Sequence, residues 1–155
     1  LGRKVSPNVA QSLYEKNLSE SHFFIDGAPR LLMTLSRKYS LYIASNGTTM
    51  VQNSRIASAG IARYFDGIFL SEELGADKPQ IEFFERATSR ILGYTPEEAI
   101  ILGDSVTSDM QGGINAGIKT CWVNPEGVPH REDIRPDYEI QYLHQLEGLL
   151  ETLDT

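Results

Sequence analysis

Long apolar runs are absent from this 155-residue chain, whose apolar stretches each extend over only a few residues. A helix that crosses a bilayer needs about 20 consecutive apolar residues, so the sequence excludes a protein built on membrane-spanning helices. Cysteine is almost absent as well. The single thiol, Cys121, cannot form a disulfide within the chain, and because it stands in an apolar segment we expect it to be buried. These features favour a cytoplasmic protein.

Basic residues are also scarce. The 14 Lys and Arg are outnumbered by 21 Asp and Glu, which gives a formal net charge of −7. Binding to a nucleic acid polymer requires a basic surface, so this class of partner is excluded, and an anionic small molecule would have to be held by local positive charge. The composition is otherwise ordinary, and the length suits one domain with its own core, as a monomer or a homodimer.

Short apolar runs alternate with stretches of helical periodicity along most of the chain. This pattern predicts an α/β fold, in which a parallel sheet is flanked by helices. The predicted strands are 41–44, 67–70, 100–103, 119–123 and 138–140, and the predicted helices are 28–38, 49–59, 79–92, 109–116 and 142–152. A capping box is expected at 95–98, and a long loop at 124–137.

Two carboxylates follow the apolar run 100–103. Asp104 comes directly after the run, and Asp109 follows five residues later. A carboxylate at the C-terminal end of a parallel strand lies in the crevice where such sheets bind ligands. Because Mg²⁺ is typically held by one or two carboxylates together with a phosphate, the pair suggests a magnesium site. The alternative is that each aspartate is an ordinary turn residue or helix N-cap.

Two further segments carry groups suited to phosphate. The run 41–44 ends in Ser45, Asn46 and Gly47, directly before a predicted helix. A hydroxyl and free N–H groups at a helix N-terminus bind phosphate oxygens, although Ser45 or Asn46 could instead simply cap the helix. Lys78 precedes a proline that can open a helix, and by default it would be an ordinary exposed lysine.

Taken together and in this order, the three segments resemble the haloacid dehalogenase superfamily of phosphohydrolases. In that family a Ser or Thr follows the second core strand, a Lys opens a later helix, and an acidic pair follows the fourth strand. Ser45, Lys78 and the pair Asp104 and Asp109 stand at the matching positions. The segments SNGT, YFDGIFLSEELGADKP and GDSVTSDMQGGINAGIKTCWVN are similar to members that dephosphorylate nucleoside monophosphates, above all pyrimidine 5′-nucleotidases.

The resemblance implies Mg²⁺-dependent hydrolysis of a phosphate monoester through an aspartyl-phosphate, with a nucleoside 5′-monophosphate as the expected substrate. Other small substrates of the family, such as a sugar phosphate or phosphoglycolate, remain alternatives, and so does a non-catalytic binding protein. The implied site residues are the metal ligands Asp104 and Asp109, the phosphate-binding residues Ser45, Asn46, Gly47 and Lys78, and the catalytic residues Lys78 and Asp109.

One feature of the family is missing. Its members carry an Asp-x-Asp after the first, central strand, and the first Asp of this motif attacks phosphorus. No Asp-x-Asp occurs in these 155 residues; Asp26 follows an apolar run but stands in Asp-Gly-Ala-Pro, which is typical of a turn. The resemblance therefore implies a C-terminal portion of a longer protein, with 1–22 as the remnant of a helical cap domain and 23–155 as a Rossmann-like core.

The missing strand has a consequence for the sheet. In the family's strand order, 5-4-1-2-3, the first strand lies between the strands that correspond to 41–44 and 100–103. Without it, both of these strands are expected to have an unpaired edge. The 155 residues alone should then be poorly stable and inactive, because exposed strand edges promote aggregation and no nucleophile is present.

Overall fold

The computed structural model describes residues 23–129 and 131–154. The strands in this part of the chain are β1 (Tyr42–Ser45), β2 (Gly67–Leu70), β3 (Ile100–Gly103), β4 (Lys119–Val123) and β5 (Tyr138–Ile140). Four of these have the predicted bounds, and β1 is shifted by one residue. The expected remnant of a cap at 1–22 lies outside the described residues.

Helices alternate with the strands, which confirms the predicted α/β class. The longer helices are α2 (Ala28–Leu35), α3 (Thr49–Ala59), α5 (Ile81–Thr88) and α7 (Gln145–Leu153). The shorter elements are η1 (Ala62–Tyr64), α4 (Ser71–Leu74), η2 (Pro96–Glu98), η3 (Val106–Met110) and α6 (Gln111–Asn115). No helix in the described ranges is long and apolar enough to cross a membrane.

Some predicted helix boundaries are wrong. Helix α5 ends at Thr88 rather than at 92, and beyond Ser89 the N–H groups of Arg90 and Ile91 bond to carbonyls only three residues back. Residues 106–110 form one turn of π-helix before α6, so the segment predicted as one helix has two parts. The expected capping box is absent: the Thr95 side chain caps nothing, and a single 3₁₀ turn follows it.

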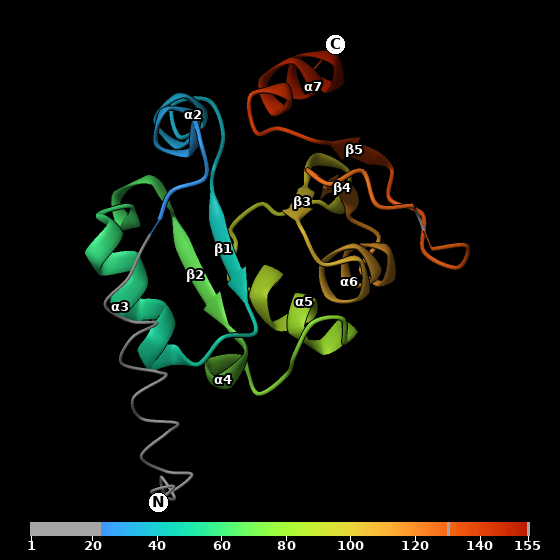
Figure 1. The fold of residues 1–155 in the computed structure, drawn as a ribbon. Helices are drawn as coiled ribbons and strands as arrows, with labels where there is room; N and C mark the ends of the chain where they lie inside the picture. The colour runs from blue at the N-terminus through green and yellow to red at the C-terminus, as the bar shows by residue number, and fades with distance from the viewer. Residues whose placement is uncertain (1–22, 130, 155) are drawn as a thin grey trace, which may run out of the picture.

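The strands form two separate parallel sheets. Strand β1 pairs with β2, whereas β4 pairs with β3 on one side and β5 on the other. No described strand joins β1 to β3, so each of them keeps one edge without a strand partner. Figure 1 shows the two sheets as separate groups of arrows. This is the arrangement expected when a strand between β1 and β3 is missing.

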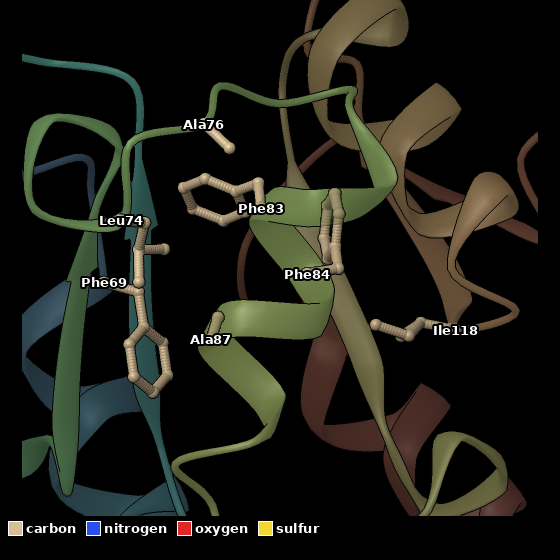
Figure 2. Packing of buried hydrophobic residues seen from close by; sticks show 7 residues of the cluster. All are labelled: Phe69, Leu74, Ala76, Phe83, Phe84, Ala87 and Ile118. Atoms are coloured by element: carbon tan, nitrogen blue, oxygen red, sulfur yellow. The ribbon is translucent and has the colours of Figure 1, made fainter.

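Helix α5 links the two sheets on one face. Figure 2 shows Phe83 and Phe84 of this helix between Phe69 of β2 and Ile118, the residue that precedes β4. The two rings lie edge to face, with centroids 5.3 Å apart, and Phe83 is completely buried. A second cluster joins α2, β4, β5 and α7. The buried apolar residues of α2 and α5 recur at helical spacing: Leu31 and Leu35 in α2, and Phe83, Phe84 and Ala87 in α5.

Candidate active site

Lys78, in the loop between α4 and α5, joins the two sheets through its ammonium group. The Nζ atom donates to the main-chain oxygen of Ala44, in β1, at 2.7 Å and to Oδ1 of Asp109, in η3, at 2.6 Å. The side chains of Lys78 and Asp109 are only 9% and 10% exposed. Lys78 is therefore not an ordinary surface lysine, because its charge is held in a largely buried ion pair.

Asp109 reaches this position because the chain turns sharply after β3. Its Oδ2 accepts a hydrogen bond of 3.2 Å from the main-chain N–H of Ser105, so both carboxylate oxygens have partners. A Cβ atom at position 103 would lie 2.3 Å from Oδ2. Gly103 is thus required for the carboxylate to approach the end of β3 this closely.

Asp104 is the first residue after β3, and its side chain is exposed. Its main-chain oxygen accepts a hydrogen bond of 3.0 Å from the indole Nε1 of Trp122, in β4. Trp122 is buried, as expected of a packing residue, but it also holds the backbone that carries Asp104. The carboxylate is therefore exposed to solvent, while the main chain that carries it is held by a hydrogen bond.

The end of β1 presents neutral groups. The Ser45 hydroxyl accepts a hydrogen bond of 3.0 Å from the N–H of Gly47, which leaves its own proton available for donation. Asn46 pairs with the main chain of Lys78 on both sides of its amide: Nδ2 donates to the carbonyl oxygen and Oδ1 accepts from the N–H, each at 2.8 Å. The segments of Ser45 and Lys78 are thereby joined.

Neither Ser45 nor Asn46 caps α3, which settles an alternative left open by the sequence. The N-cap position belongs to Thr48, whose side chain makes no capping bond. The carboxylate of Glu72 lies at this helix start instead, where Oε2 accepts from the N–H of Thr49 at 2.7 Å. A negative group at this position is favoured by the helix dipole.

The acidic groups suit a hard divalent cation with few protein ligands. The described ranges contain no group of three or more His, Cys, Asp and Glu that could hold a metal ion. Mg²⁺ needs only one or two carboxylates, since waters and phosphate oxygens complete its shell. The exposed carboxylate of Asp104 fits this donor chemistry, while Asp109 is paired with Lys78.

Among the predicted site residues, contacts therefore connect Asn46, Lys78 and Asp109, with Ser45 and Gly47 at the end of β1 and Asp104 at the end of β3. Sequence reasoning missed the positions of two supporting side chains. Trp122 holds the main chain at Asp104, and Glu72 binds the start of α3. Each contact joins residues 18 to 23 positions apart, which no local pattern in the sequence reveals.

The chain is similar to known hydrolases. A family model described as haloacid dehalogenase-like hydrolase matches residues 3–123. The pyrimidine 5′-nucleotidases PynA of Streptococcus pneumoniae and YjjG of Escherichia coli are 39% and 32% identical to the chain, over 99% and 94% of its length. The HAD-hydrolase YfnB of Bacillus subtilis is 37% identical over 99% of the chain.

The fold is also that of a solved structure. The crystal structure of YfnB bound to magnesium, in its orthorhombic form, superposes with a TM-score of 0.92 and 38% identity over 96% of the chain. The match covers 65% of the YfnB chain in that structure. The chain likewise spans 66%, 64% and 65% of the full lengths of YfnB, PynA and YjjG, just under two thirds of each.

Proposed function

The chain belongs to the haloacid dehalogenase-like hydrolase family, and we propose that the protein containing it hydrolyses nucleoside 5′-monophosphates to the nucleoside and phosphate. The observation that carries this proposal is the position of Lys78. Its ammonium group is held between the main chain of β1 and Asp109, at the edge where β1 ends in a hydroxyl and β3 in a carboxylate.

The groups at the end of β1 suit the phosphate. The Ser45 hydroxyl and the main-chain N–H of Asn46 are donors for its oxygens, and Gly47 allows the backbone to come close. Lys78 offsets the negative charge of the transferring phosphoryl group. In phosphoryl transfer, such positioning and charge stabilisation are most of what a protein can supply.

The groups at the end of β3 suit Mg²⁺. Asp104 would hold the ion, with Asp109 as a second acidic group that also keeps Lys78 in place. When bound, Mg²⁺ supplies positive charge that stabilises a phosphate ester under attack. The crystal structure of the similar YfnB with magnesium supports this assignment.

The attacking carboxylate is not among these residues. We place the family's Asp-x-Asp on a strand between β1 and β3, where the sheet is interrupted. Attack on phosphorus there would form an aspartyl-phosphate and release the nucleoside, and water would then release phosphate. The 155 residues alone are expected to be inactive.

The test uses the full-length protein and measures phosphate release from UMP, dUMP, TMP, sugar phosphates and phosphoglycolate, with Mg²⁺ and with EDTA. We expect Mg²⁺-dependent release from the pyrimidine monophosphates. Asp104→Asn should weaken Mg²⁺ binding and lower kcat/KM by roughly 10²–10³-fold, because metal charge stabilisation is worth several kcal/mol. Asp66→Asn is the matched control. Asp66 is an exposed carboxylate that precedes the N-terminal end of β2, whereas Asp104 follows the C-terminal end of β3.

Three results would contradict parts of the proposal. Good hydrolysis of sugar phosphates without any of pyrimidine monophosphates rejects the nucleotide substrate and keeps the phosphatase. Activity that survives EDTA rejects the role of Mg²⁺. Equal losses in Asp104→Asn and Asp66→Asn reject the assignment of Asp104 to the metal.

A further inference from the structure

Two asparagines in this chain make the same unusual contact in different surroundings. The side-chain amide of Asn46 pairs with the main chain of Lys78 through two hydrogen bonds of 2.8 Å. The side-chain amide of Asn124 pairs with the main chain of Val128 in the same way, through bonds of 2.9 and 3.0 Å. In both cases the amide takes the place that a neighbouring strand would take, satisfying one N–H and one C=O of the partner residue.

The two pairs differ in burial. Asn124 is 3% exposed and makes a further bond of 2.6 Å to Glu139, so its pairing lies inside the protein and fixes the start of the loop after β4. Asn46 is exposed. Hydrogen bonds formed at the surface add little net stability, because water can replace them. The pairing of Asn46 therefore needs another explanation than the stability of the fold.

The position of Lys78 supplies that explanation. A lysine side chain has a long flexible stem, so its ammonium group is well placed only if its main chain is also held. Asn46 holds the main chain of Lys78, and Ala44, two residues earlier in the same segment, accepts from Nζ at 2.7 Å. Both ends of the lysine are thereby fastened to the end of β1.

We propose that Asn46 is a positioning residue that sets the place of the Lys78 ammonium group, and that it acts on the reaction through Lys78. Oδ1 and one N–H of Nδ2 are both bonded to the main chain of Lys78, so the amide holds that residue through both of its main-chain polar groups. The expected effect of Asn46 on activity rests on the proposed function, but its effect on the position of Lys78 does not. The role goes beyond the phosphate-binding part that the sequence suggested for Asn46.

The loop of Lys78 has other supports, so the loss of Asn46 should shift the lysine without unfolding the loop. Arg86 donates to the carbonyl oxygens of Leu74 and Gly75 at 2.6 and 2.9 Å. Asn115 donates to the carbonyl oxygen of Pro79 at 3.0 Å. These bonds hold the loop on either side of Lys78, but none of them reaches β1.

The first experiment does not depend on activity. The full-length protein is treated with a limiting amount of acetic anhydride, and acetylation of Lys78 is followed by mass spectrometry. Because the Lys78 side chain is 9% exposed and paired with Asp109, it should react slowly. Asn46→Ala should raise the rate at Lys78 roughly 10-fold or more, an effect of the size expected when one fixed contact is lost. Asn124→Ala should leave that rate unchanged.

The second experiment separates the two roles of Asn46 by kinetics and melting. Asn46→Ala should lower kcat roughly 10–100-fold with little change in KM, because a misplaced catalytic group costs about this much, and Tm should fall by less than about 2 °C. Asn124→Ala should show the opposite pattern, with kcat unchanged and Tm lower by roughly 3–8 °C, because it leaves buried polar groups unpaired.

The decisive comparison adds Lys78→Met. If Asn46 acts through Lys78, Asn46→Ala should cost almost nothing further in the Lys78→Met background, because residues that act as a unit are not additive. A full additional loss there means that Asn46 contacts the substrate itself and overturns the proposal. An unchanged acetylation rate in Asn46→Ala overturns it as well.

If Asn46→Ala does not fold, Asn46→Asp replaces it in the acetylation, kinetic and double-variant experiments. It keeps an acceptor for the Lys78 N–H but faces the Lys78 carbonyl with an oxygen, so it should also raise the acetylation rate. Faster acetylation of Lys78 in a protein that hydrolyses no phosphate ester supports the positioning role and rejects the proposed function. The two proposals can therefore fail separately.

Discussion

Strands β1 and β3 both border the interruption between the two sheets, but the chain that follows each carries different chemistry. Strand β1 ends in the hydroxyl of Ser45 and is followed by an amide and a glycine, and these groups are neutral and can donate hydrogen bonds. After β3 come two carboxylates, Asp104 and Asp109. The positive charge between them is that of Lys78, which contacts Ala44 in β1 and Asp109 beyond β3. One side therefore suits phosphate oxygens and the other a cation.

The strands also differ in burial. Strand β4, which has a neighbour on each side, buries Thr120, Cys121 and Trp122. Strands β1 and β3, each with a free edge, have no buried residue, and the apolar side chain of Leu102 in β3 is 38% exposed. Apolar strands that remain half exposed indicate that β1 and β3 are adapted to a neighbour that the described residues do not provide.

The largest expected effect concerns these free edges. The 155 residues produced on their own should melt broadly or aggregate, because each buried main-chain group left unpaired costs roughly 1–3 kcal/mol and free edges pair with other chains. Thermal melting followed by circular dichroism, together with size-exclusion chromatography, would be compared with the full-length protein. A monomer with a sharp cooperative transition would show that β1 and β3 need no further strand.

Lys78→Met tests the contacts by which the Lys78 ammonium group connects β1 with the segment after β3. It leaves Asp109 buried without its cation, which should lower the free energy of unfolding of the full-length protein by about 3–5 kcal/mol. Removing both charges, in Lys78→Met with Asp109→Leu, should recover most of this loss, and both variants should be much less active than the unchanged protein. Urea denaturation measures both. If the double variant is as unstable as Lys78→Met, the instability comes from lost packing and not from an unpaired charge.

The smallest expected effect concerns Cys121, which is buried in β4. Burial raises the pKa of the Cys121 thiol from 9.0 to about 11. Since the folded pKa lies above the unfolded one, the contribution of the thiol to stability is complete below pH 9 and is lost as the pH rises through about 11. A shift of this size corresponds to roughly 2–3 kcal/mol.

The measurement is urea denaturation of the full-length protein and of Cys121→Ala, under reducing conditions, from neutral pH to pH 11. The variant should be less stable at neutral pH, because it leaves a cavity, but it should lose less stability across the alkaline range. Parallel curves for the two proteins would mean that Cys121 is not held neutral by burial.

Much of the fold could be predicted, because the signals for its elements are local. Each strand is a short apolar run between turn residues, and the packed faces of α2 and α5 follow helical periodicity. The wrong helix boundaries lie where hydrogen bonds to residues outside a helix determine where that helix begins. Helix α7 begins at Gln145 rather than at 142, and the side chain of Gln145 binds the N–H groups of Gln141 and Tyr142, both at 2.8 Å.

The residues of the candidate site could be proposed from the sequence, but the contacts that they make could not. Its chemical groups could be named because hydroxyl, ammonium and carboxylate groups follow strands or open a loop in a family-like order. Phosphate binding by Asn46 stays a prediction, and the sequence did not indicate that its amide pairs with the main chain of a residue 32 positions away. Trp122 is buried, and its indole N–H binds the backbone of Asp104, 18 positions away. The helical and strand periodicity of the sequence indicates neither contact.

The sequence by itself determined which segments become strands and helices and which chemical groups stand at the strand ends, because both depend on neighbours a few residues away. Only the tertiary structure decided that the Lys78 ammonium group lies between Ala44 and Asp109, which are 34 and 31 positions from it in the chain. The physical reason is that a buried charge is stable only beside its counterpart, and packing of the two sheets around α5 brings that counterpart close.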